Sequence, residues 1–91
     1  MLMINEQLRK ELYEMYSQII VFDNPSYDNS IIGVSTDGRV VYDVDMMIEE
    51  FAEENGCTIE ESTDFVYYNT VRALSYINDE YKPIIKENLM V

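Results

Sequence analysis

Four aspartates in a short polar stretch are the residues whose types and spacing first raise the prospect of chemistry. The stretch DNPSYDNSIIGVSTDGRVVYD holds Asp23, Asp28, Asp37 and Asp43. Closely spaced carboxylates and carbonyls are what Ca²⁺ requires. Their spacing does not fit the D-x-D-x-D-G calcium loop, however, and Pro25 removes flexibility that such a loop uses. We therefore expect no metal site.

The same stretch has the composition of turns. Asp, Asn and Ser side chains hydrogen-bond to nearby backbone groups, and a residue before proline is extended, so Asp23, Asn24 and Asp28 are expected to organise a loop. Asp37 and Gly38 join two β-branched runs, which is a strong hairpin signal with positive φ expected at the glycine.

Catalytic residues are scarce. The chain has no histidine, which is the commonest acid–base residue, and its one cysteine, Cys57, has no imidazole to activate it. A pair of carboxylates could serve a hydrolase, but in a chain with eighteen acids such a pair is no evidence for one. The glycines fit the hairpin better than a phosphate-binding loop. We expect a protein that is not an enzyme and uses no cofactor.

Charge is the strongest global feature. The 91 residues contain 18 acids and 6 bases, a net charge of −12, which exceeds the 2–8 units useful for solubility. Residues 21–57 carry nine of the acids and one base. Such a field repels nucleic acids and anionic membranes and attracts proteins with basic surfaces. We expect a basic protein partner and no direct contact with nucleic acid or membrane.

Apolar periodicity predicts the elements that position these charges. An amphipathic helix is expected over 5–19, strands over 31–35 and 39–43, and a second helix over 44–54 capped by Asp43 or Asp45. The glutamates of the second helix lie opposite the apolar stripe of that helix.

The second half of the chain is predicted to contain a third helix and a strand. Thr58 and Glu61 have the spacing of a capping box, which starts a helix running to about residue 77. That helix is apolar almost all round, which predicts packing on more than one side. The closing PIIKENLMV is expected to pair as a third antiparallel strand. The predicted fold is a single α+β domain, residues 1–91, with a small antiparallel sheet packed against three helices.

Polar groups inside the third predicted helix need partners. We expect Asn69 and Arg72 to hydrogen-bond to backbone carbonyls or to an aspartate of the loop at residues 23–28, pinning the loop to the helix, and the alternative is that Arg72 contacts an acid of a partner. Tyr67, Tyr68 and Tyr76 either border the core or form an interface, because aromatic rings with polar tips suit both.

A resemblance is carried by three strings: FDNPSYDNSIIGVSTDGRVVYDVDMM, DFVYYNTVRALSY and KPII. Over some 70 residues the chain resembles a family of small, uncharacterised acidic proteins from phages and prophages of Gram-positive bacteria. That family brings no settled activity, cofactor or catalytic residue. The phage setting implies an inhibitor of a host defence nuclease, such as an anti-CRISPR protein.

The expected function is therefore binding to the basic nucleic-acid-binding surface of a CRISPR effector or other defence nuclease. The residues expected to contact this partner are acidic: Asp37, Asp43, Asp45, Glu49, Glu50, Glu53 and Glu54. The alternative is a non-enzymatic phage interaction protein, for example a homodimer through the tyrosine-bearing helix or an accessory factor. One cysteine and no recognisable leader predict an intracellular location, the bacterial cytoplasm.

Overall fold

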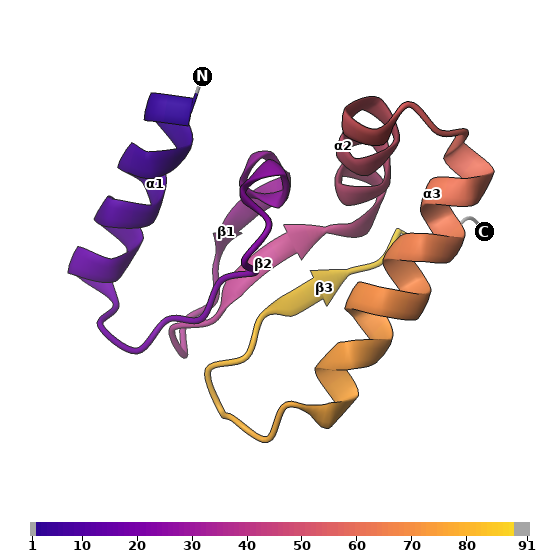
Figure 1. Ribbon diagram of the computed structural model, residues 1–91. Helices are drawn as coiled ribbons and strands as arrows, with labels where there is room; N and C mark the ends of the chain where they lie inside the picture. The colour runs from indigo at the N-terminus through magenta and orange to yellow at the C-terminus, as the bar shows by residue number, and fades with distance from the viewer. Residues whose placement is uncertain (1, 89–91) are drawn as a thin grey trace.

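The computed structural model describes residues 2–88 and shows an α+β fold, as predicted (Figure 1). Its elements in chain order are α1 (Leu2–Met15), η1 (Pro25–Ser30), β1 (Ile31–Val34), β2 (Val40–Asp43), α2 (Val44–Asn55), α3 (Ile59–Phe65), η2 (Val66–Val71), η3 (Arg72–Tyr76) and β3 (Ile84–Lys86). The helix predicted over 5–19 ends earlier, at Met15, and residues beyond it form an irregular link to η1.

The sheet has the order β1-β2-β3 and is mixed. Strands β1 and β2 form the expected antiparallel hairpin, with Val34 opposite Val40 and an irregularity between Ile31 and Gly33. Strand β3 pairs with β2 in parallel, with Val41 opposite Ile84, so the predicted antiparallel pairing of the C-terminal strand is wrong. The helices between β2 and β3 form a long crossover, which returns the chain to the start of β2 and makes the strands parallel.

The hairpin turn is built as its sequence predicts. Gly38 has φ 82°, in the left-handed region, and its N–H donates to the Ser35 carbonyl at 3.0 Å. The Ser35 hydroxyl donates to the Asp37 carboxylate across the turn. Asp37 therefore organises the turn while lying exposed at its tip.

Both predicted helix starts are confirmed. Asp43 caps α2, and its carboxylate accepts from the Met46 N–H at 3.1 Å. The helix ends at Gly56 with φ 62°. Thr58 and Glu61 form the capping box of α3, each side chain accepting from the other residue's N–H at 3.1 Å.

The helical segment 59–76 departs from the prediction of a helix packed on several sides. It passes from α3 into a π-helical turn, η2, in which the Arg72 N–H donates to the Tyr67 carbonyl, and then into the 3₁₀ segment η3. Within it, Ser62 and Val66 are the fully buried residues. Tyr67, Tyr68 and Tyr76 lie at the surface, although the prediction of a helix packed on several sides counted their rings in its apolar circumference.

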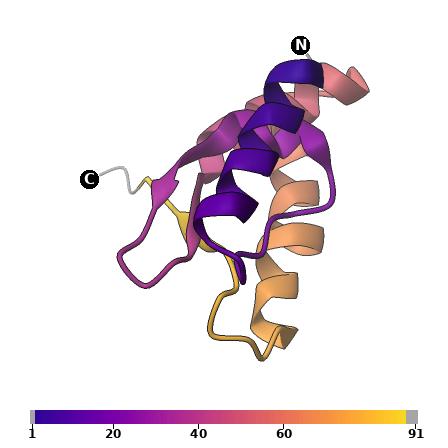
Figure 2. The same ribbon diagram turned by 90° about the vertical axis from the view of Figure 1, so that its left-hand side faces the viewer.

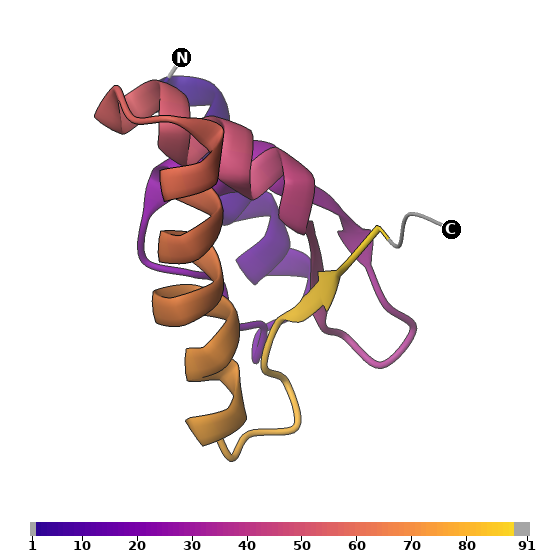
Figure 3. The ribbon, with the colours of Figure 1, turned by 90° about the vertical axis from the view of Figure 1, so that its right-hand side faces the viewer.

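One apolar core joins the elements. Tyr42 and Val40 of β2 pack with Met47 of α2, Leu12 of α1 and Val66 of η2. Helix α1 lies on one side of the molecule and the segment 59–76 on the other, with the sheet between them (Figures 1, 2 and 3). Helix α2 follows directly from β2 and packs against η1 and α3, which leaves its far side open.

Candidate functional site: an acidic helix face and an aromatic helix face

Helix α2 separates an apolar side from an acidic side. Its buried residues are Val44, Met47, Ile48 and Ala52. The carboxylates on the opposite side fall into two rows at helical spacing, which together we call the acidic face: Asp45, Glu49 and Glu53 in one row, Glu50 and Glu54 in the other. All five are exposed except Glu50, which is half-buried.

The acidic face has no cationic partner in the described part of the chain. Among residues 2–88, no Lys or Arg lies within ion-pair distance of its carboxylates. Asp45 accepts a hydrogen bond from Asn88 Nδ2 at 2.9 Å, and Glu50 accepts a long one from Asn29 Nδ2 at 3.5 Å.

This arrangement works against the stability of α2. Carboxylates four residues apart repel one another, and Glu53 and Glu54 stand at the negative end of the helix dipole. Each such like-charged pair costs about 0.2–0.5 kcal/mol. Stabilisation of α2 therefore does not explain why these carboxylates are present.

Two predicted members of the partner-binding set do not belong to the acidic face. Asp43 is 9 % exposed, and its carboxylate accepts from Met46 N–H and from Asn88 Nδ2 at 3.1 Å. These hydrogen bonds, led by that from Asn88, lower the pKa of Asp43. Because its carboxylate is engaged by the helix cap and by Asn88, we leave Asp43 out of the acidic face. Asp37 lies at the opposite end of β2 from α2 (Figure 1), so it does not extend the face.

Arg72 does not reach the loop at residues 23–28, and that prediction is wrong. It is exposed, and its guanidinium lies over the Tyr68 ring, 5.1 Å from the centroid. Asn69 Nδ2 donates to the Phe65 carbonyl of its own helix at 3.2 Å. Both side chains find partners within one helical segment, which sequence spacing of three or four residues allows.

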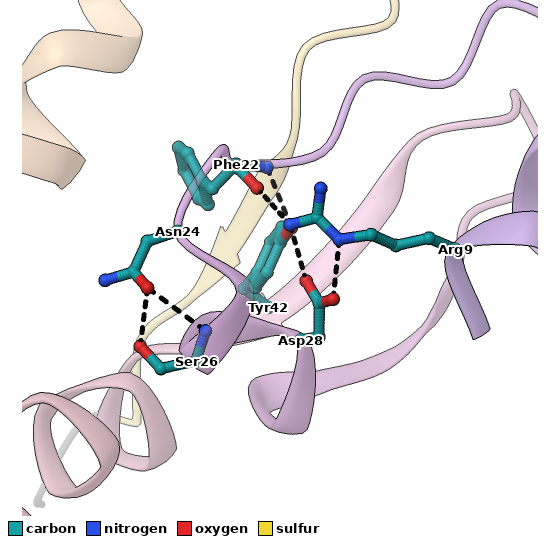
Figure 4. Close-up of polar contacts among 6 residues, drawn as sticks. All are labelled: Arg9, Phe22, Asn24, Ser26, Asp28 and Tyr42. Carbon is teal, nitrogen blue, oxygen red and sulfur yellow. Dashed lines mark hydrogen bonds and ion pairs between the residues drawn. The ribbon is translucent and has the colours of Figure 1, made fainter. Parts of the chain in front are cut away.

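Arg9 of α1 holds the loop instead (Figure 4). Its Nε and Nη2 donate to the two carboxylate oxygens of Asp28 at 2.6 and 2.9 Å, and Nη2 also donates to the Phe22 carbonyl at 2.6 Å. The Asp28 side chain is fully buried and that of Arg9 is a quarter exposed. Hydrogen bonding to Asp28 raises the pKa of Arg9.

Tyr42 completes this cluster from the sheet. Its hydroxyl accepts from the Phe22 N–H at 3.0 Å, and its ring lies 4.7 Å from that of Phe22. Burial raises the pKa of Tyr42 to about 12, so it stays neutral. The cluster ties α1, the loop and β2 together, and we read its buried charges as structural.

The two other loop residues that were expected to shape turns, Asn24 and Asp23, differ in their hydrogen bonding. Asn24 caps η1, accepting from the N–H and hydroxyl of Ser26 at 3.1 and 2.9 Å, as its turn role predicts. Asp23 is exposed, and no described residue hydrogen-bonds to its carboxylate, so its predicted structural role is wrong. Asn24 and Pro25 set the turn without it.

The segment 59–76 presents an aromatic face to solvent. Phe65, Tyr68 and Tyr76 are 42 %, 67 % and 76 % exposed, and Tyr67 also reaches the surface. Partial burial and the nearby Glu87 and Asp45 carboxylates raise the pKa of Tyr67. Large exposed apolar clusters of this kind mark interaction surfaces.

Comparison of the chain with protein-family models, curated proteins and solved structures finds no match. No three His, Cys, Asp or Glu residues in the described part of the chain are arranged to hold a metal ion. None of the helices within residues 2–88 is both long and apolar enough to cross a membrane.

Proposed function

We propose that this protein is a phage-encoded, non-enzymatic inhibitor of a bacterial defence nuclease, of the anti-CRISPR kind. It acts in the host cytoplasm by binding the nuclease's basic nucleic-acid-binding surface, and it needs no cofactor. The phage setting comes from the sequence resemblance. The observation that carries the mechanism is the acidic face of α2, whose five carboxylates lack a cationic partner within the described residues and whose glutamates repel one another along the helix.

The spacing of these charges supports mimicry of a nucleic-acid strand. From Asp45 to Glu54 the helix rises about 14 Å at 1.5 Å per residue, so its five charges are spaced unevenly but average one per about 3.4 Å along the axis. One strand of DNA carries a phosphate charge about every 3.4 Å. A groove lined with Lys and Arg to bind phosphates would meet a similar linear charge density here.

Competition is tested with two charge variants of equal net charge. The first, the acidic-face variant, carries Glu49→Gln, Glu50→Gln, Glu53→Gln and Glu54→Gln. The second, the matched control, removes four acids elsewhere: Glu6→Gln, Glu11→Gln, Glu14→Gln and Glu80→Gln. Both keep residue size and most helix propensity, and only the first removes the linear array.

The assay is capture from a defence-bearing bacterial lysate, followed by purification of the captured protein. Wild type and the matched control should compete with DNA or RNA for that protein, and their association should slow as salt screens the field. The acidic-face variant should lose competition. Simultaneous binding of nucleic acid and wild-type protein would overturn the proposal.

A second candidate is favoured by the exposed rings of Phe65, Tyr68 and Tyr76. The protein would then be a phage interaction factor, either a homodimer or an accessory subunit, without nucleic-acid mimicry. Sedimentation equilibrium separates the two. Self-association that Tyr68→Leu abolishes, together with no competition by wild type, would favour this second candidate.

A further inference from the structure

A shallow hollow opens on the outer side of the segment 59–76. It has a volume of about 580 Å³ and is lined by Asp64, Phe65, Tyr67 and Tyr68, and we call it the aromatic hollow. Phe65 is fixed by stacking on Phe51, with ring centroids 4.1 Å apart and planes 17° from parallel. The two tyrosines lie on the π-helical turn η2, a local irregularity often found at functional sites. The hollow is thus shaped by side chains of α3 and η2.

The chemistry of the lining suits a cation. Faces of aromatic rings attract guanidinium and ammonium groups, and the Arg72 guanidinium already lies 5.1 Å from the Tyr68 centroid. Since Tyr68 is 67 % exposed, much of its ring surface stays open to a second group. Asp64 adds a carboxylate, which a guanidinium can meet with two parallel N–H donors.

The neighbouring charges also favour a cation. Glu87 and Asp45 both act electrostatically on Tyr67, at the border between the hollow and the acidic face of α2. A second copy of the chain would bring the same carboxylates against them, on a molecule of net charge −12. Charge complementarity therefore favours a basic partner over self-association.

We propose that the aromatic hollow binds an arginine side chain of the protein partner, with the aliphatic stem and guanidinium on Phe65 and Tyr68 and the charge facing Asp64. The inference rests on the proposed function for the basic nature of the partner. It assigns the specificity of binding to a site outside α2, beside the acidic face. The acidic face supplies long-range attraction, and the aromatic hollow selects one side chain.

The test uses a capped Gly-Arg-Arg-Gly peptide as probe, with its lysine and citrulline counterparts, titrated into the isotopically labelled protein and followed by NMR. The arginine peptide should shift the amide signals of residues 64–68 and bind more tightly than the lysine peptide. Citrulline has the same shape without the charge, and should not shift them. Tyr68→Leu should weaken arginine binding about two- to fivefold.

Tyr13→Leu is the matched control, because Tyr13 is 47 % exposed on α1 and does not line the hollow. It should leave the affinity for the arginine peptide unchanged. Equal binding of the arginine and lysine peptides would overturn the assignment, as would signal shifts confined to α2. A dimer that Tyr68→Leu dissociates would assign the hollow to a second copy instead.

The acidic-face variant separates this inference from the proposed function. It should bind the arginine peptide more weakly overall, yet adding Tyr68→Leu to it should weaken binding by the same factor as in wild type. If Tyr68→Leu still weakens peptide binding but wild type never competes with nucleic acid, the proposed function is wrong and arginine binding by the hollow is supported. If wild type competes and Tyr68→Leu leaves peptide affinity unchanged, only the assignment of arginine to the hollow is wrong.

Discussion

Replacing Arg9 with alanine should destabilise the fold far more than replacing Arg72, although both are arginines in helical segments of an acidic protein. Arg9 makes three hydrogen bonds, two to the Asp28 carboxylate and one to the Phe22 carbonyl. Arg72 is exposed and makes a cation–π contact with Tyr68. The two substitutions remove the same side chain from very different surroundings.

The magnitude follows from what is left behind. Arg9→Ala leaves the fully buried Asp28 carboxylate without its cation, and breaking a buried ion pair in this way costs about 3–5 kcal/mol. Because Arg9 is a quarter exposed, water can partly replace it, and we expect about 2–4 kcal/mol. For a chain of this length, that corresponds to a fall in Tm on the order of 10–30 °C.

Urea unfolding followed by circular dichroism measures the effect. Arg9→Lys keeps the charge but not the two-pronged geometry, and should lose an intermediate amount of stability. Arg72→Ala should lose no more than about 1 kcal/mol, the size of an exposed cation–π contact. An Arg9→Ala protein within about 0.5 kcal/mol of wild type would refute this reasoning, as would an Arg72→Ala change that proves the more damaging.

Two further predictions concern the turn and the cap. Gly38→Val should lose at least about 1 kcal/mol by thermal melting, because its φ of 82° strains any residue with a Cβ. Gly33→Ala, at a glycine without positive φ and with open space around a Cβ, should lose little, and equal losses would argue against backbone strain. Asp43→Ala should cost about 1 kcal/mol at pH 7. The Asn88 hydrogen bond lowers the pKa of Asp43 in the fold, so this stabilisation is present above about pH 4 and disappears as the pH falls through the lowered pKa. The stability gap between the two proteins should therefore narrow in acid, and a gap that does not change with pH would contradict the lowered pKa of Asp43.

Local sequence signals predicted the local structure well. The Asp37-Gly38 turn, the Asp43 cap and the Thr58–Glu61 capping box each depend on residues a few positions apart. Such signals act through backbone hydrogen bonds within one turn, so the rest of the fold does not alter them.

Contacts between residues far apart in the sequence could not be predicted from such local signals. The direction of β3 depends on the path of the chain through the crossover, and a run of β-branched residues carries no direction. The partner of Asp28 was also missed, although Arg9 offered a signal. Arg9 lies three and seven residues before Leu12 and Tyr16 of the predicted apolar stripe. Arg72 also lies at helical spacing from apolar residues, Tyr68 and Tyr76, so periodicity alone could not choose between the two arginines.

The candidate surface was predicted in part. Helical periodicity placed Glu49, Glu50, Glu53 and Glu54 on one side of α2, and the structure puts them there with Asp45. The predicted hairpin already put Asp37 in the turn before β2, at the end away from α2, so its assignment to the same surface did not follow from the sequence. Periodicity could not show that a π-helical turn and the Phe51–Phe65 stack shape a hollow beside the tyrosines.

The most direct test of the central claim is the affinity of labelled DNA or RNA for the captured nuclease, measured by fluorescence anisotropy against increasing inhibitor. We predict that wild type and the matched control displace the nucleic acid, and that the acidic-face variant does not. The variant must be as stable as wild type or up to about 1.5 kcal/mol more stable, because it removes like-charged pairs. Displacement by a folded acidic-face variant at the wild-type concentration would contradict the claim.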